Sequence, residues 1–274
     1  MVRAAGLEPA RPLDREILSL LCLPISPRPH SIDNKKTATR IPRLSIHANS
    51  VIMQKYKKTI KPISEPHFDE NFQQTLDNLF AWRRDVRRFL TRPVEPTILD
   101  GLISNACLAP SVGNSQPWRF VWVDNLVRRT AIRENFKKAN IDALNDYSDE
   151  QAKKYASLKL SGLDQAPEQL AVFADKTTKL GHGLGKKTMP ETIEYSVVGA
   201  INNMWLTARA HGVGLGWVSI LEPKNINAIL DVPEDWLLIA YLCIGYPEEE
   251  HLDPELQRHN WQQRISSKDF IIQR

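Results

Sequence analysis

The chain has 274 residues, of which 42% are hydrophobic and 25% are charged, as is ordinary for a soluble globular protein. The formal net charge of +4 comes wholly from residues 1–52, because the remainder carries equal numbers of acidic and basic residues. The body of the protein therefore lacks the positive charge typical of nucleic-acid-binding proteins, and we expect no nucleic-acid partner. No run of about 18 apolar residues exists, so we expect no membrane-spanning helix and no membrane partner.

Residues 1–52 differ from the rest of the chain and contain six of its 18 prolines. They lack the basic start and long apolar core of a secretory signal, and Glu8, Asp14 and Glu16 are unlike an acid-poor transit peptide. We expect either a disordered extension or residues upstream of a true start at Met53, and we prefer the second. Residues 53–274 are expected to form one domain. Three cysteines without metal-ligand spacing favour a reducing cytoplasm and indicate no metal site.

The hydrophobic periodicity predicts a mixture of large helices and strands from about residue 68 onward. In chain order, the first predicted elements are a helix from about 72 into the arginines at 83–88, a helix over 97–108 and a strand over 118–123. A polar helical region over 130–168 and a strand over 171–174 follow. The last predicted elements are a helix over 195–211, a strand over 214–220, a short helix over 224–230 and a strand over 236–244. Strands and helices do not alternate regularly, which favours an α+β fold over a doubly wound sheet.

Residues 83–87 read Arg-Arg-Asp-Val-Arg and combine three guanidinium groups with one carboxylate. Planar guanidinium groups bind two phosphate oxygens at once, so Arg83, Arg84 and Arg87 are candidates for a phosphate site. The alternative is a solvated helix end, where cations also offset the helix dipole. Asp85 is either a salt-bridge partner, which would lower its pKa, or an acid/base group beside a cofactor.

Two further segments carry polar groups that could contact an aromatic cofactor. Ser111, Asn114 and Gln116 offer hydroxyl and amide groups for a heteroaromatic ring edge and a sugar chain, and Gly113 permits close backbone approach. Ordinary turn chemistry is the alternative for this loop. Ser219 ends the sequence Gly-Leu-Gly-Trp-Val-Ser, whose alternating glycines would let a flat ring lie on the strand; an ordinary strand hydroxyl is the alternative. Together with the arginines, these segments suggest a phosphorylated aromatic cofactor.

These three segments, in this order, resemble the nitroreductase superfamily, and within it the family of 5,6-dimethylbenzimidazole synthases. The resemblance covers about residues 68–264, and the aspartate at position 85 stands where ordinary nitroreductases carry serine. It implies a nitroreductase-like FMN-binding fold with a central mixed β-sheet flanked by helices. It also implies an intertwined homodimer with FMN at the subunit interface.

The resemblance implies that the enzyme consumes reduced FMN in an O2-dependent fragmentation to dimethylbenzimidazole, the lower ligand of vitamin B12, and erythrose 4-phosphate. A separate flavin reductase would supply the reduced FMN. Asp85 would manage protons near the ring and ribityl chain, and Ser219 would hydrogen-bond the flavin near its oxygen-reactive edge. The arginines would bind the phosphate, with Arg258 or Arg264 as a further candidate. The full set of expected FMN-binding residues is Arg83, Arg84, Asp85, Val86, Arg87, Ser111, Gly113, Asn114, Gln116 and Ser219.

Two other functions remain open from the sequence. Asn114 departs from the synthase pattern, which carries an apolar residue there, and matches ordinary nitroreductases. The first alternative is therefore an NAD(P)H-dependent FMN nitroreductase. The second is a non-catalytic protein that binds or stores flavin.

Overall fold

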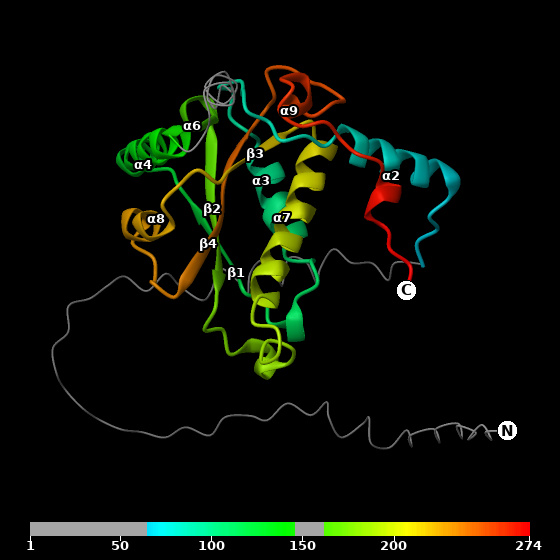
Figure 1. Ribbon diagram of the computed structural model, residues 1–274, viewed down its shortest axis with the longest axis horizontal. Helices are drawn as coiled ribbons and strands as arrows, with labels where there is room; N and C mark the ends of the chain where they lie inside the picture. The colour runs from blue at the N-terminus through cyan, green and yellow to red at the C-terminus, as the bar shows by residue number, and fades with distance from the viewer. Residues whose placement is uncertain (1–64, 146–161) are drawn as a thin grey trace. The chain divides into compact units, whose positions relative to one another are not determined.

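The computed structural model describes residues 65–145 and 162–274, and Figure 1 shows how their elements are arranged. Residues His67–Arg274 form one compact unit, which holds every element named below. The other unit, Met1–Pro66, lies outside the described residues except for its last two. The predicted extension 1–52 and the predicted start at Met53 therefore stay predictions.

One antiparallel sheet of four strands forms the centre of the unit, in the order β1-β2-β4-β3. The strands are β1 Trp118–Trp122, β2 Glu168–Asp175, β3 Gly214–Val218 and β4 Trp236–Gly245. The α+β class is confirmed, but the predicted mixed sheet is wrong, because every neighbouring pair of these strands is antiparallel. β2 and β3 are parallel to each other, yet β4 lies between them and pairs with both. Among these four strands, no two that are parallel to each other are hydrogen-bonded.

Helices cover both faces of this sheet (Figure 1). They are α2 Glu70–Trp82, α3 Pro96–Ala106, α4 Leu126–Asn145, α6 Gly162–Gln165, α7 Thr192–Ala210, α8 Pro223–Leu230 and α9 Glu255–Arg258, with short 3-10 turns η1 Val112–Asn114, η2 Leu180–Gly183 and η3 Ser267–Phe270. The predicted polar helical region is seen as α4 and α6, and its residues 146–161 lie outside the described part of the chain. Within the described ranges, no helix combines the length and apolar character that crossing a membrane requires.

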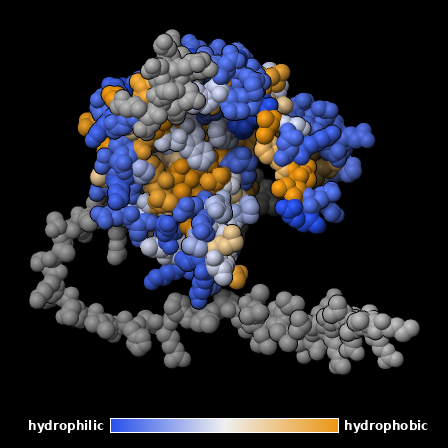
Figure 2. All heavy atoms as spheres, viewed as in Figure 1, coloured by the Kyte–Doolittle hydropathy of each residue, from blue (hydrophilic) through white to orange (hydrophobic). Residues whose placement is uncertain are grey.

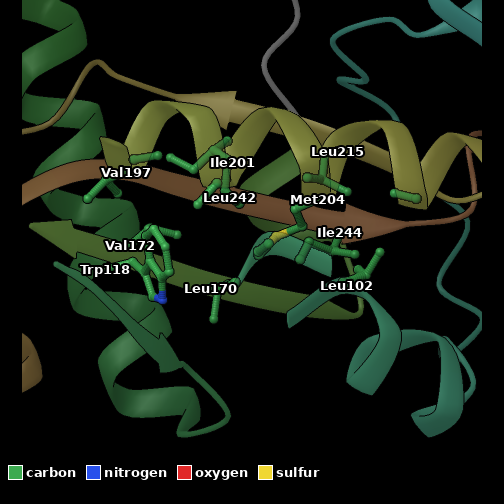
Figure 3. Packing of buried hydrophobic residues seen from close by; sticks show 14 of the residues in the cluster. Leu102, Trp118, Leu170, Val172, Val197, Ile201, Met204, Leu215, Leu242 and Ile244 are labelled. Atoms are coloured by element: carbon green, nitrogen blue, oxygen red, sulfur yellow. The ribbon is translucent and has the colours of Figure 1, made fainter. Parts of the chain in front are cut away.

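The central strands β2 and β4 are buried on both faces, which explains their nearly continuous apolar sequences. On one face, β4 packs against α3 and α7; Figure 3 shows Leu102, Ile201 and Met204 close to Leu242 and Ile244. The opposite face carries a second cluster, to which α4, α6 and α8 contribute. The predicted helix over 195–211 is present as α7, and its buried residues lie at the centre of the first cluster.

Candidate functional site

The arginine segment follows α2 and runs beside strand β3. α2 ends at Trp82, and the backbone turns extended at Arg83. The backbone N–H of Val86 then donates to the carbonyl oxygen of Leu215 at 2.9 Å. A Cβ atom on Gly216 would overlap the carbonyl oxygen of Val86, and one on Gly214 would lie 2.6 Å from its side chain. The alternating glycines therefore accommodate Val86, and the prediction that they leave room for a flat ring is wrong.

Asp85 is held by two hydrogen bonds at this crossing. Its Oδ1 accepts from the backbone N–H of Trp217 at 2.9 Å, and its Oδ2 accepts from Nε of Arg87 at 3.3 Å. Its side chain is 38% exposed by surface area, yet the surrounding protein withdraws the carboxyl from water. Burial raises the pKa of Asp85, although the Trp217 N–H and the Arg87 charge oppose this. The predicted salt bridge to an arginine is present, but the lowered pKa expected from it is wrong.

Arg83 and Arg84 form a positive cluster that α7 supports. The guanidinium of Arg83 lies over the indole ring of Trp205, 4.8 Å from its centroid, and Nε1 of Trp205 donates to the carbonyl oxygen of Arg84 at 3.1 Å. Burial lowers the pKa of both arginines, and the positive charge of Arg264 lowers both further. Nε of Arg84 is buried without a hydrogen-bond partner among the described residues. This cluster of like charges can accept an anion.

The C-terminal candidates for this cluster are distinguished by their partners. Arg258 forms an ion pair with Asp253 at 3.2 Å, whereas the charge of Arg264 acts on both Arg83 and Arg84. Arg88 pairs with two carboxylates, those of Glu249 and Glu255. The charge of Arg264 therefore acts on the cluster, while Arg258 and Arg88 are paired with carboxylates.

The polar loop around η1 is a separate assembly at the beginning of α7. Oγ of Ser196 on α7 accepts from the backbone N–H of Val112 at 3.0 Å. Oγ of Ser111 accepts from the backbone N–H of Gln116 at 3.1 Å, so the predicted turn chemistry is present. Gly113 has a φ of 56°, and Asn114 and Gln116 have φ values of 53° and 45°. Two non-glycine residues thus occupy the left-handed region that side chains disfavour.

Helix α7 separates the two parts of the predicted site. Ser196 anchors the polar loop and Trp205 anchors the arginine segment, and nine residues of helix span about 13 Å along the axis. Ser219 belongs with the arginine segment, because it follows β3 two residues beyond Trp217, about 7 Å along an extended chain. Its side chain is exposed. Within one chain, the structure therefore places Asp85 and Ser219 at the end of β3 and the polar loop elsewhere along α7.

Several residues that organise these two parts were not candidates from the sequence. Trp205 belongs to the apolar pattern of α7, which predicts packing and gives no sign of its hydrogen bond to Arg84. Ser196 is one of several polar residues of α7, with Thr192, Asn203 and Thr207, and the sequence does not single it out. Ser115 lies in the polar loop between Asn114 and Gln116, and its Oγ is buried without a partner among the residues described. The contacts of Trp205 with Arg84 and of Ser196 with Val112 join segments that are far apart in the sequence, so no local pattern predicts them.

Comparison with known proteins agrees with this architecture. A sequence model of the nitroreductase family matches residues 80–246. The 5,6-dimethylbenzimidazole synthase of Rhodospirillum rubrum is 55% identical over 199 residues, covering 73% of this chain and 94% of that protein. A 5,6-dimethylbenzimidazole synthase of Rhodobacter capsulatus is 43% identical over 202 residues, covering 74% and 98% respectively.

Among solved structures, oxidized iodotyrosine deiodinase bound to FMN and 3-iodo-L-tyrosine is similar in fold. It aligns with a TM-score of 0.56 at 23% identity, over 64% of this chain and 91% of that chain. The likeness in fold, the match of the family sequence model and the two synthase relatives agree with one another. This chain belongs to the nitroreductase family.

Proposed function

We propose that this chain is a 5,6-dimethylbenzimidazole synthase, which uses O2 to fragment reduced FMN to dimethylbenzimidazole and erythrose 4-phosphate. The observation that carries the proposal is Asp85, a carboxyl with a raised pKa fixed between an arginine cluster and strand β3. Identities of 55% and 43% to synthases, over nearly their whole length, support the same assignment. Reduced FMN supplies the electrons for O2, and the protein supplies position and proton transfer.

The arginine cluster fits the phosphate of FMN. Arg83, Arg84 and Arg264 repel one another electrostatically, and Nε of Arg84 is a buried donor without a partner among the described residues. A bound phosphate would relieve the repulsion and accept from that donor. Arg87 combines this role with its contact to Asp85, and Val86 keeps the segment seated on β3.

Asp85 is the residue that holds or releases a proton beside the flavin. A raised pKa keeps a proton on the carboxyl at higher pH than an ordinary aspartate would, which suits a group that must both give and take a proton. Ser219, exposed at the end of β3, hydrogen-bonds the flavin on the same side. Ser111, Gly113, Asn114 and Gln116 contact the ring edge and the ribityl chain.

A second copy of the chain completes the site. The arginine segment and the polar loop are anchored about 13 Å apart along α7, so an interface that joins one part of each copy would bring them to one ligand. Large apolar side chains are exposed on α2 and the C-terminal segment, namely Phe72, Phe80, Phe270, Ile271 and Ile272. Figure 2 shows hydrophobic surface in the region of these two segments. Exposed apolar surface of this kind favours burial in a homodimer.

A NAD(P)H-dependent FMN nitroreductase is the second candidate, and Asn114 is the observation that favours it. The two enzymes differ in what happens to the flavin. A nitroreductase returns FMN unchanged after passing its electrons on, whereas the synthase destroys the ring. The synthase also depends on a separate flavin reductase, because its substrate is FMN that is already reduced.

One experiment separates these functions. FMN is reduced without oxygen, mixed with the protein in stoichiometric amount and then exposed to air. We expect FMN to be lost while dimethylbenzimidazole and erythrose 4-phosphate appear, as measured by liquid chromatography and mass spectrometry. Complete recovery of oxidized FMN would contradict the synthase assignment. Rapid NADPH oxidation with a nitroaromatic acceptor would then support the nitroreductase over simple flavin storage.

A further inference from the structure

The segment from Thr178 to Gly185, including η2, lies directly against the polar loop. Gly181 and Gly113 meet backbone to backbone: a Cβ atom on Gly181 would overlap the carbonyl oxygen of Gly113. A Cβ atom on Gly113 would lie 2.9 Å from the carbonyl oxygen of Leu184 and 3.0 Å from that of Gly181. Neither position has room for a Cβ atom, so only glycine fits at both. The two backbones therefore fix each other's position.

Two further contacts extend this support along the loop. Oγ1 of Thr178 donates to the carbonyl oxygen of Ser115 at 3.4 Å. A Cβ atom on Gly185 would lie 2.7 Å from Cγ2 of Val112, so Gly185 packs equally closely on the beginning of the loop. The segment 178–185 therefore contacts the polar loop at three successive places, at Val112, Gly113 and Ser115.

The loop needs such support because part of its backbone is strained. Gln116 has a φ of 45°, a conformation that most non-glycine residues adopt at a cost, and Asn114 has a φ of 53°, which asparagine adopts more readily. Strained residues persist only where their surroundings hold them in place. Both side chains are candidates for binding the flavin, so the conformation that the support maintains is the one that presents them.

We propose that the segment 178–185 holds Asn114 and Gln116 in the conformation that binds the flavin, and that Gly181 is a positioning residue of the site. This inference rests on the proposed function, because it takes the polar loop to be a flavin-binding loop. Gly181 has no side chain to offer a ligand and acts through its close contacts with the backbone of Gly113 and Cβ of Ser115.

The test compares Gly181→Ala with Gly183→Ala. Gly181 and Gly183 have similar positive φ values of 73° and 78°, so an alanine is strained equally in both. A Cβ atom on Gly183 meets nothing closer than Cε of Lys187 at 3.8 Å, whereas one on Gly181 meets the loop. The difference between the variants therefore isolates the contact of residue 181 with the polar loop, at Gly113 and Ser115.

We expect both variants to lose thermal stability, and only Gly181→Ala to bind oxidized FMN at least tenfold more weakly, as measured by quenching of flavin fluorescence. The visible circular dichroism of bound FMN should also change only in Gly181→Ala. Equal FMN affinity and equal spectra in the two variants would overturn the proposal. Wild-type protein that binds FMN without forming dimethylbenzimidazole would contradict the proposed function alone, and absence of FMN binding would contradict both.

A second pair of variants keeps the proposal testable if Gly181→Ala does not fold. Gly185→Ala introduces a methyl group against Cγ2 of Val112, and Val112→Ala removes that atom. We expect Gly185→Ala to weaken FMN binding, and the double variant Gly185→Ala/Val112→Ala to recover part of the lost affinity, because the φ of 80° at position 185 strains the alanine in both variants. An affinity in the double variant no better than in Gly185→Ala would contradict the support mechanism.

Discussion

The backbone N–H of Trp217 donates to Oδ1 of Asp85 at 2.9 Å, which ties the carboxyl to strand β3. The same segment is fixed on its other side, because Gly216 admits the carbonyl group of Val86 against the strand. Backbone contacts to β3 therefore hold Asp85 in place in addition to its ion pair with Arg87.

Replacing Asp85 with Asn should abolish dimethylbenzimidazole formation while FMN binding is retained. The amide oxygen can still accept from the Trp217 N–H, so the segment stays in place, but the side chain no longer exchanges a proton. Asp164→Asn is the matched control, because Asp164 on α6 also pairs with an arginine, Arg133 at 3.0 Å, and its side chain is 57% exposed. Product is measured by liquid chromatography. Full product formation by Asp85→Asn would show that this carboxyl transfers no essential proton.

The same substitution should stabilise the protein in a pH-dependent way. Burial raises the pKa of Asp85 above its ordinary value of 3.8, so between these two values the folded state binds more protons than the unfolded state. Asp85 therefore lowers stability as pH rises through this window. The free energy of unfolding of Asp85→Asn minus that of the wild type should increase from pH 4 upward and then level off. Urea titrations at several pH values measure this difference, and one that decreases with pH would contradict the raised pKa.

The sequence predicted the elements well where the signal is local. The apolar period of α7 and the apolar run of β4 depend on neighbouring residues, and both elements lie within a few residues of their predicted ends. β2 was predicted over 171–174 but extends over Glu168–Asp175, because pairing with β1 and β4 lengthens it. Strand order and direction could not be predicted, since they depend on which distant segments meet.

In the candidate site too, features that depend on distant parts of the chain could not be predicted from the sequence. Arginines and an aspartate in one short segment were recognisable because their chemistry is local. The sequence predicts free space above Gly214 and Gly216, but Val86, which is far away in the sequence, fills that space. A salt bridge to Arg87 predicts a lowered pKa for Asp85, but the pKa is raised. Burial of the carboxyl outweighs the effect of the Arg87 charge, and burial depends on the packed structure.

Removing the charge of Arg264 should weaken FMN binding selectively. Hydrogen bonds to charged groups contribute about 1.5 to 3 kcal/mol, so Arg264→Gln should reduce FMN affinity by about tenfold or more. Arg258→Gln is the control, because Arg258 is already paired with Asp253. Riboflavin lacks the phosphate, and its affinity should change little in either variant. An equal loss of FMN and riboflavin binding in Arg264→Gln would place this residue away from the phosphate.

Replacing Gly216 with Ala should displace the arginine segment. The added methyl group overlaps the carbonyl oxygen of Val86, and overpacking of this kind costs about 1 to 3 kcal/mol. Gly101→Ala is the control, since a Cβ atom there meets nothing within 4 Å and alanine favours the helix by about 0.5 to 1 kcal/mol. Urea unfolding should show a loss for Gly216→Ala and a small gain for Gly101→Ala. A Gly216→Ala protein as stable as the wild type would contradict the close crossing.

Charges placed on the C-terminal segment should dissociate the proposed homodimer. Ile271 and Ile272 are 68% and 72% exposed in the single chain, and burying two such side chains contributes about 3 to 6 kcal/mol at an interface. The variant Ile271→Asp/Ile272→Asp should therefore sediment as a monomer at concentrations where the wild type is a dimer. Leu126→Asp on α4, where the side chain is 75% exposed, is the control and should stay dimeric. If the site requires both copies, the monomeric variant should also lose FMN binding. Retention of tight binding by a monomer would show that one chain holds the whole site.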